Sequence, residues 1–101
     1  MLNDNDQFQV LRKIQKKPTS TQIELAKDLG ISLGKLNYCI KALKNKGLIK
    51  INNFRNNPNK SNYLYILTPK GVSTKMYLTI NFMKKKMKEY DELKRELDDK
   101  K

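Results

Sequence analysis

The 101-residue chain contains no histidine, no tryptophan and only one cysteine. A zinc site built from protein ligands needs several Cys or His side chains, so these counts exclude one. Without histidine the chain lacks the usual general base and the usual partner of a nucleophile, and we expect it not to be an enzyme. The single cysteine, Cys39, falls at a predicted core position and is interpreted as a small buried hydrophobe. The composition therefore predicts no catalytic residues, no metal and no cofactor.

Long apolar runs are also missing, and acidic residues are scarce in the first three quarters of the chain. No segment is long and apolar enough for a transmembrane helix or the core of a signal peptide, which predicts a cytoplasmic protein. Residues 1–75 carry 14 Lys or Arg against 4 Asp or Glu, whereas residues 76–101 carry 8 against 6. This basic excess favours nucleic acid as the partner. A membrane surface is disfavoured because no helix pairs a wholly apolar face with a wholly basic one.

Residues 23–36 carry the spacing of a helix–turn–helix. Two short helices that cross closely need a small residue at their contact, which is Ala26, and a turn residue that tolerates a positive φ, which is Gly30. Leu36 then holds the second helix onto the first. The remaining inward positions follow at helical spacing and are Leu25, Leu29, Ile31, Cys39 and Ile40. On this pattern alone, two packed helices that read no DNA remain an alternative.

Cap signals mark the ends of these helices. Thr21 is a predicted N-cap for the first helix of the pair, and Ser32 is a predicted N-cap for the second. The second helix is expected to end at Gly47, with Leu48 folding back to close a Schellman motif. An earlier helix, expected over residues 5–16, precedes the pair.

The sequence that follows changes from helical period to strand-like alternation. Residues 48–54 and 63–67 are β-prone and are separated by a polar stretch with two cations, which predicts a hairpin with a long tip. Thr68 and Pro69 then supply an N-cap and a proline at the first helical position, so a long last helix can start there. Helix–turn–helix followed by a two-stranded hairpin is the order of a winged helix, and the hairpin tip would be its wing.

The last helix, expected to end near residue 98, carries an apolar seam. Its members recur at alternating steps of four and three, with Lys94 as an interruption, and are Met76, Ile80, Met83, Met87, Tyr90 and Leu97. An apolar seam with charged flanks over about three heptads indicates helix–helix association, so we expect a homodimer interface of the coiled-coil type. The alternative is a helix whose first half covers its own core and whose end frays in water. Parallel and antiparallel pairing both remain open, because methionine packs tolerantly.

We therefore predict a mostly α fold with a small β-hairpin: a winged helix–turn–helix DNA-binding domain at residues 1–71 and a C-terminal dimerisation helix at residues 72–101. The leading end of the third helix would reach base edges in the major groove. There Asn37 can bond adenine in two-point fashion and Lys35 can donate to guanine, while other side chains suit phosphates. The full set of predicted DNA contacts is Ser32, Leu33, Gly34, Lys35, Asn37, Tyr38, Lys41 and Lys44 on the helix, with Arg55 and Lys60 on the wing.

Residues 23–43 resemble the helix–turn–helix of MarR-type winged-helix regulators. More specific strings are Leu-Gly-Lys-Leu-Asn-Tyr-Cys at residues 33–39 and Asn-Phe-Arg-Asn at residues 53–56, which are similar to a short, exopolysaccharide (EPS)-associated subgroup of MarR-family transcriptional regulators. The likeness covers nearly the whole chain. It implies a sequence-specific regulator that binds double-stranded DNA as a homodimer, with exopolysaccharide-related genes as its targets.

The chain also departs from the family pattern at its start. Full-length MarR proteins begin with a long helix that joins the dimer interface and helps to frame an effector pocket, whereas only a few residues precede the first expected helix here. A small-molecule effector is therefore doubtful. Two other winged-helix functions remain open. A protein–protein assembly module without sequence-specific DNA binding would expose an apolar patch on the third helix, and an RNA-binding winged helix would prefer single strands.

Overall fold

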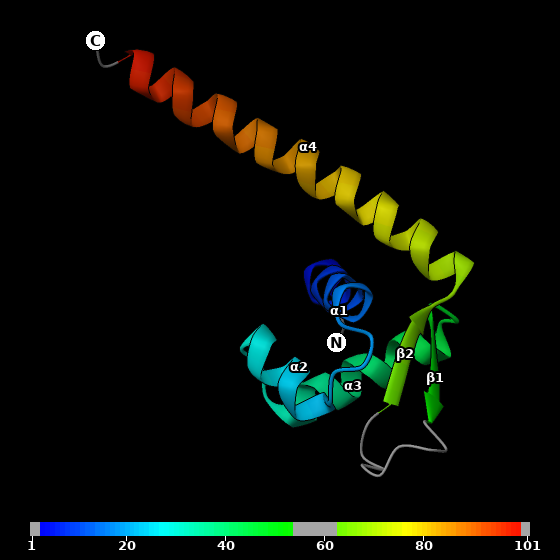
Figure 1. Ribbon diagram of the computed structural model, residues 1–101. Helices are drawn as coiled ribbons and strands as arrows, with labels where there is room; N and C mark the ends of the chain where they lie inside the picture. The colour runs from blue at the N-terminus through cyan, green and yellow to red at the C-terminus, as the bar shows by residue number, and fades with distance from the viewer. Residues whose placement is uncertain (1–2, 54–62, 100–101) are drawn as a thin grey trace.

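The computed structural model describes residues 3–53 and 63–99, which form a winged helix–turn–helix with a long helix attached (Figure 1). The elements, in chain order, are α1 (Asp4–Lys16), α2 (Gln22–Leu29), α3 (Leu33–Asn45), β1 (Ile49–Asn53), β2 (Tyr63–Leu67) and α4 (Pro69–Asp99). The predicted fold class, mostly α with a small β-hairpin, is confirmed. The predicted start of the first helix and the predicted end of the last helix each lie one residue inside the observed limit, a difference that is usual at helix ends.

Local capping bonds explain where the first three helices begin. The side chains of Thr21 and Ser32 each accept a hydrogen bond from the backbone N–H three residues further on, both at 3.1 Å. Asn3 caps α1 in the same way at 2.7 Å, a cap that the sequence alone does not single out. Each bond satisfies a backbone donor that a helix leaves unpaired at its start. The predicted N-caps Thr21 and Ser32 are confirmed.

Two glycines end the helices of the helix–turn–helix. Gly30 and Gly47 have φ values of 67° and 74°, in the left-handed region that favours glycine. The residues that follow them, Ile31 and Leu48, each donate a backbone N–H to a carbonyl five residues back, at 3.0 Å. These are the long-range bonds of Schellman motifs, so both predicted helix ends are confirmed.

One hydrophobic core joins α1, α2, α3 and the hairpin. The residues predicted to meet where α2 crosses α3 are buried: Leu25, Ala26, Leu36, Cys39 and Ile40. Leu29 and Ile31 are half-buried and pack against this cluster. From α1, Leu11 and Ile14 enter the same core. Removal of this apolar surface from water is the main force that holds the small domain together.

The hairpin closes one side of the core. β1 and β2 pair in antiparallel fashion, from Ile49 opposite Leu67 to Asn53 opposite Tyr63. Ile49 is buried and its neighbour Lys50 is exposed, as expected for a strand with one face on the core.

The observed first strand begins one residue later than the predicted run of residues 48–54, whose last residue lies outside the described ones. Leu48 belongs to the turn that ends α3, where its N–H bonds the Leu43 carbonyl. The predicted wing tip lies outside the described residues, and so do both of its predicted DNA contacts, Arg55 and Lys60.

The start of α4 is in direct contact with the end of α3. The Thr68 hydroxyl accepts a hydrogen bond from the Gly71 N–H at 3.0 Å and donates one to the Gly47 carbonyl at 2.6 Å. The Thr68 N–H donates to the Leu48 carbonyl at 3.0 Å. A Cβ on Gly71 would lie 2.0 Å from that same Leu48 oxygen, so a larger residue does not fit. The predicted cap at Thr68 is confirmed, and the need for glycine at position 71 has a steric cause.

α4 then passes along the side of α1 that faces away from α2 and α3, and extends beyond the body (Figure 1). Leu78 is buried, and the Phe82 ring stacks on Phe8 of α1 with 5.0 Å between centroids. Every side chain of residues 83–99 is exposed. No helix among the described residues is both long enough and apolar enough to cross a membrane. The molecule is accordingly elongated, with extents of 64 × 26 × 24 Å.

Candidate nucleic-acid interface

α3 has one buried and one exposed side. Its buried side holds the helix against the core through Leu36, Cys39, Ile40 and Leu43. The DNA contacts predicted for this helix are exposed, except for the half-buried Asn37, and are Ser32, Leu33, Gly34, Lys35, Tyr38, Lys41 and Lys44. The fold therefore gathers the predicted α3 residues at the leading end and along the outer face of one helix.

The first turn of α3 leaves room for another molecule to approach its backbone. A Cβ added to Gly34 would meet no atom within 4 Å, so the fold itself does not require glycine there. Glycine inside a helix costs roughly 0.5–1 kcal/mol relative to alanine. The N-terminal end of a helix also attracts anions, because its N–H groups and dipole point outward. An unneeded glycine at this end is consistent with a surface shaped for a phosphate-bearing partner.

Lys35 is held by an ion pair with another helix. Its Nζ lies 3.5 Å from Oδ2 of Asp6, in the first turn of α1. The Lys35 side chain is 49% exposed and that of Asp6 18%, so the pair contributes little stability, about 0–1 kcal/mol. Any partner that recruits Lys35 competes with this carboxylate. The sequence does not reveal the contact, because the two residues lie on helices whose packing angle is a tertiary property.

A second acidic residue of the body, Asp28, pairs with lysines that lie away from the outer face of α3. Asp28, near the end of α2, lies 3.7 Å from Nζ of Lys13 and 3.8 Å from Nζ of Lys17. Within the part of the chain that the structure describes, no ion pair involves Lys41 or Lys44. These two ammonium groups therefore remain available to an anionic partner.

Cys39 lies beneath this surface and is chemically quiet. Its side chain is 1% exposed. Burial raises the pKa of the Cys39 thiol, and the nearby charge of Asp6 raises the pKa further. Because the thiolate is the reactive form, a buried thiol with a raised pKa is inert at neutral pH. The interpretation of Cys39 as a buried hydrophobe is confirmed.

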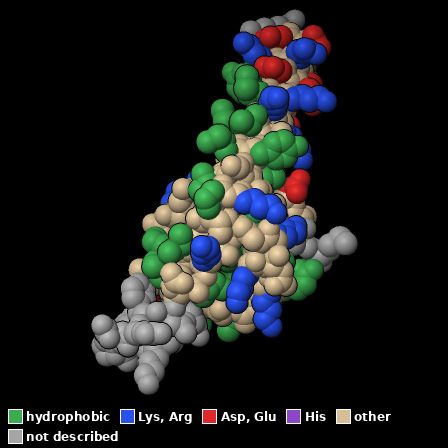
Figure 2. Space-filling view, turned by 90° about the vertical axis from the view of Figure 1, so that its right-hand side faces the viewer, with side chains coloured by type: hydrophobic (Ala, Val, Ile, Leu, Met, Phe, Trp, Pro, Cys, Tyr) green, Lys and Arg blue, Asp and Glu red, His purple; other side chains and the backbone are tan. Residues whose placement is uncertain are grey.

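The residues predicted for the dimer interface form a stripe along α4, which we call the seam. Their exposed fractions lie between 47% and 67%, and the residues are Met76, Ile80, Met83, Met87, Tyr90 and Leu97. Figure 2 shows hydrophobic side chains along the projecting helix, below a tip where charged groups gather. Contiguous apolar surface of this kind commonly marks an interaction site. Association through the seam stays a prediction.

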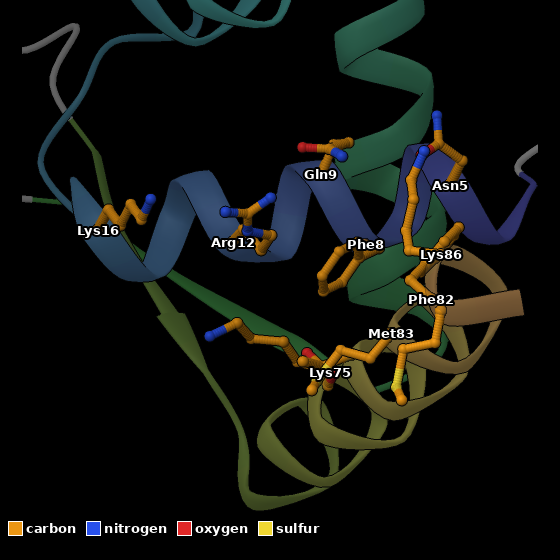
Figure 3. A pocket seen from close by; sticks show the side chains of 11 residues that line it. Asn5, Phe8, Gln9, Arg12, Lys16, Lys75, Phe82, Met83 and Lys86 are labelled. Carbon is orange, nitrogen blue, oxygen red and sulfur yellow. The ribbon is translucent and has the colours of Figure 1, made fainter. Parts of the chain in front are cut away.

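A groove of about 800 Å³ runs between α1 and α4 beside the seam (Figure 3). It is lined by the stacked rings of Phe8 and Phe82, with the Arg12 guanidinium carbon 5.3 Å from the centre of the Phe8 ring. Met83 and Met87 belong to both the groove and the seam. Further cations line the groove and are Lys16, Lys75 and Lys86. The sequence does not predict this groove, because it depends on how α1 and α4 pack.

The comparisons with known proteins agree with this fold. Residues 4–50 match the family model described as winged helix-turn-helix DNA-binding. The chain thus carries a winged helix–turn–helix domain, to which α4 is added. No curated protein sequence matches the chain.

Solved structures similar to the chain include MarR proteins. A mutant of MarR from E. coli, complexed with operator DNA, has a TM-score of 0.61 and 30% identity over 71% of this chain and 50% of that one. MarR from Staphylococcus aureus, in complex with salicylate and kanamycin, has a TM-score of 0.69 and 26% identity over 85% and 56%. FabT from Streptococcus pneumoniae, in complex with DNA, has a TM-score of 0.64 and 22% identity over 85% and 58%, which shows the fold alone. The chain spans about half the length of these proteins.

Proposed function

We propose that this chain is a MarR-family transcriptional regulator that binds specific sites on duplex DNA as a homodimer. The observation that carries the proposal is the two-sided character of α3, whose inner side is buried while its outer side presents Lys35, Asn37 and Lys41. The excess of 14 basic over 4 acidic residues in residues 1–75 supports an anionic partner. MarR from E. coli, whose fold is similar, has been solved with operator DNA.

In the proposed complex α3 lies in the major groove and divides its work between bases and phosphates. Asn37 bonds the N6 and N7 positions of an adenine, and Lys35 leaves Asp6 to donate to O6 or N7 of a guanine. Ser32, Leu33 and the bare backbone at Gly34 approach the base edges. The phosphate contacts that position the domain come from Tyr38, Lys41 and Lys44.

The proposed division of labour places DNA binding in residues 1–71 and dimerisation in residues 72–101. The exposed seam supports the second assignment, because a helix that leaves its own domain needs a partner for its apolar side. Two-fold symmetry would set the two α3 helices about 34 Å apart and require an operator with inverted repeats. Regulation of exopolysaccharide genes rests on the resemblance of the sequence to that subgroup and stays a prediction.

A protein–protein assembly module is the competing function. It would need an apolar patch on the outer side of α3. The exposed apolar side chains there, Leu33 and Tyr38, are surrounded in sequence by Lys35, Asn37 and Lys41 instead. This mixture favours a nucleic-acid surface over a protein-binding one.

The proposal is tested with the purified chain and a library of genomic DNA fragments. We expect selective retention of fragments that contain inverted repeats, and their positions would show whether exopolysaccharide genes are targets. If a dimer neutralises about 6–10 phosphates, log K should fall with log[salt] at a slope of about −5 to −9. Competition with single-stranded RNA should leave duplex binding intact. Failure to retain any fragment at low salt would contradict DNA binding.

A further inference from the structure

α4 is divided along its length by charge. Residues 69–88 contain six lysines and no acidic residue. Residues 89–99 contain six acidic residues and two basic ones. The basic part runs beside α1 (Figure 1), whereas the acidic part belongs to the exposed projecting end, where charged side chains gather (Figure 2). The two parts are complementary in charge, and where they meet Nζ of Lys86 lies 3.6 Å from Oε2 of Glu89. One straight helix cannot fold the rest of its acidic end back onto its own basic part.

The groove between α1 and α4 has the character that an acidic amphipathic helix requires. Its apolar lining is Phe8, Phe82, Met83 and Met87, and the cations Arg12, Lys75 and Lys86 stand around it (Figure 3). The end of α4 carries acidic side chains together with exposed Tyr90, Leu93 and Leu97, which lie on one side of the helix at helical spacing. An apolar stripe with acidic flanks matches an apolar groove with a cationic rim.

We propose that the acidic end of α4 from a second copy of this chain occupies the groove between α1 and α4, so that the two α4 helices pair antiparallel. This inference rests on the proposed homodimer and specifies its geometry. Parallel pairing would set the acidic end against the acidic end and the lysine-rich part against the lysine-rich part. Antiparallel pairing sets opposite charges together at both ends of the contact.

The seam restricts the register of this pairing to steps of one heptad, and opposite charges beside the seam select one of these registers. Antiparallel helices place the first apolar position of each heptad opposite the second one of the partner. Met87 then meets Tyr90 of the second copy, and Ile80 meets Leu97 of the second copy. In this register Lys84 flanks the seam next to Asp91 of the second copy, and symmetry repeats the contact. The same overlap lays residues 90–99 of the second copy along the groove.

Helix direction is measured with a single spin label on the full chain. The variant Asp99→Cys carries the label near the exposed end of α4, and the unsubstituted chain is the control for labelling of Cys39, which is buried. At 1.5 Å per residue, antiparallel pairing separates the two labels by about 30 Å along the axis. A short distance of about 15–20 Å, typical of parallel helices, would overturn the geometry while leaving the homodimer in place. A monomer without dipolar coupling would overturn both.

A charge exchange tests the contact between Lys84 and Asp91. Lys84→Glu and Asp91→Lys should each weaken the dimer at least tenfold in analytical ultracentrifugation, because each creates two like-charge contacts. The double variant should regain most of the lost affinity, because the pair is restored with its signs reversed. A double variant no tighter than the single ones would overturn the register.

A second pair of variants tests occupation of the groove. Arg12→Glu, which reverses a charge on α1 at the groove, should weaken the dimer. Lys27→Glu, the same charge change on α2, should not. Equal effects of these two would overturn occupation of the groove.

Discussion

Lys35 on the outer side of α3 and Asp6 in the first turn of α1 form an ion pair, with 3.5 Å between Nζ and Oδ2. In the free protein this pair holds the lysine that we propose to read guanine. The Asp6 carboxylate also adds a negative charge beside a surface proposed to meet phosphates. A partly exposed pair of this kind is weak, so DNA can displace the carboxylate at small cost.

Replacement of Asp6 by asparagine should therefore strengthen DNA binding. Asp6→Asn frees Lys35 and removes a repulsive charge, so affinity for duplex DNA should rise severalfold at low salt and less at high salt. The free energy of unfolding should fall by no more than about 1 kcal/mol. Fluorescence anisotropy with a labelled duplex measures the affinity. Asp4→Asn, which removes the same charge from the same turn, should change it less. Equal effects of the two variants would show that the Lys35 contact is irrelevant to binding.

Base reading and phosphate binding should separate by mutation. Asn37→Ala should cost about 1–3 kcal/mol on the operator and little on random DNA, because a lost bidentate base contact removes discrimination. Lys44→Ala should weaken both kinds of DNA by a smaller and similar amount, since phosphates carry no sequence. Parallel titrations of operator and random duplexes give, for each variant, the ratio of its affinities for the two kinds of DNA. An unchanged ratio for Asn37→Ala would mean that α3 does not read bases in the proposed way.

The glycine in the first turn of α3 should trade stability against binding. Gly34→Ala causes no clash, because a Cβ at this position meets no atom within 4 Å. Alanine favours the helix more than glycine does, so we expect the free energy of unfolding to rise by roughly 0.5–1 kcal/mol. The new methyl group stands where DNA would approach, so operator affinity should fall. Thermal unfolding and anisotropy measure the two effects.

A matched control for this variant is Gly71→Ala, the same chemical change at a site where the Cβ would lie 2.0 Å from the Leu48 oxygen. It should lower the melting temperature. If Gly34→Ala left both the stability and the affinity unchanged, the first turn of α3 would have no special role.

Charges placed in the seam should separate the dimer. Met83→Glu combined with Met87→Glu would bury carboxylates without partners, which is costly. We expect a monomer by light scattering, with the helical circular dichroism of the winged domain retained. Operator affinity should drop sharply, because the two DNA-binding domains are no longer linked and cannot bind both half-sites together.

The control for the seam is Asn81→Glu, an exposed position of α4 that lies off the seam. This variant should stay dimeric. A wild-type chain that is monomeric at tens of micromolar, or a Met83/Met87 variant that remains dimeric, would show that α4 is not the interface.

Much of the fold could be predicted from the sequence, because its signals are local. The caps at Thr21 and Ser32 and the Schellman turns at Gly30 and Gly47 each depend on residues within one helical turn, and all four are observed. The outer side of α3 also follows from helical period, once Leu36 and its neighbours are placed in the core.

The remaining features depend on how elements pack, and local pattern does not contain that information. The pair between Lys35 and Asp6 and the stack of Phe8 on Phe82 join helices that are far apart in the chain. From the sequence alone, Gly71 is only a residue with a low helix propensity. Only the close approach of the Leu48 carbonyl explains why no side chain fits there.

The contacts of Gly71 and Thr68 with the turn that follows α3 form a rigid junction between α3 and α4. Since the Leu48 carbonyl presses on position 71 and Thr68 bonds to both Gly47 and Leu48, the direction of α4 is locked to that of α3. In a dimer that pairs through the C-terminal part of α4, this angle sets the distance between the two α3 helices and their relative tilt. Substitutions at this junction would then change the half-site spacing that the protein selects, although the substituted residues contact neither DNA nor the partner.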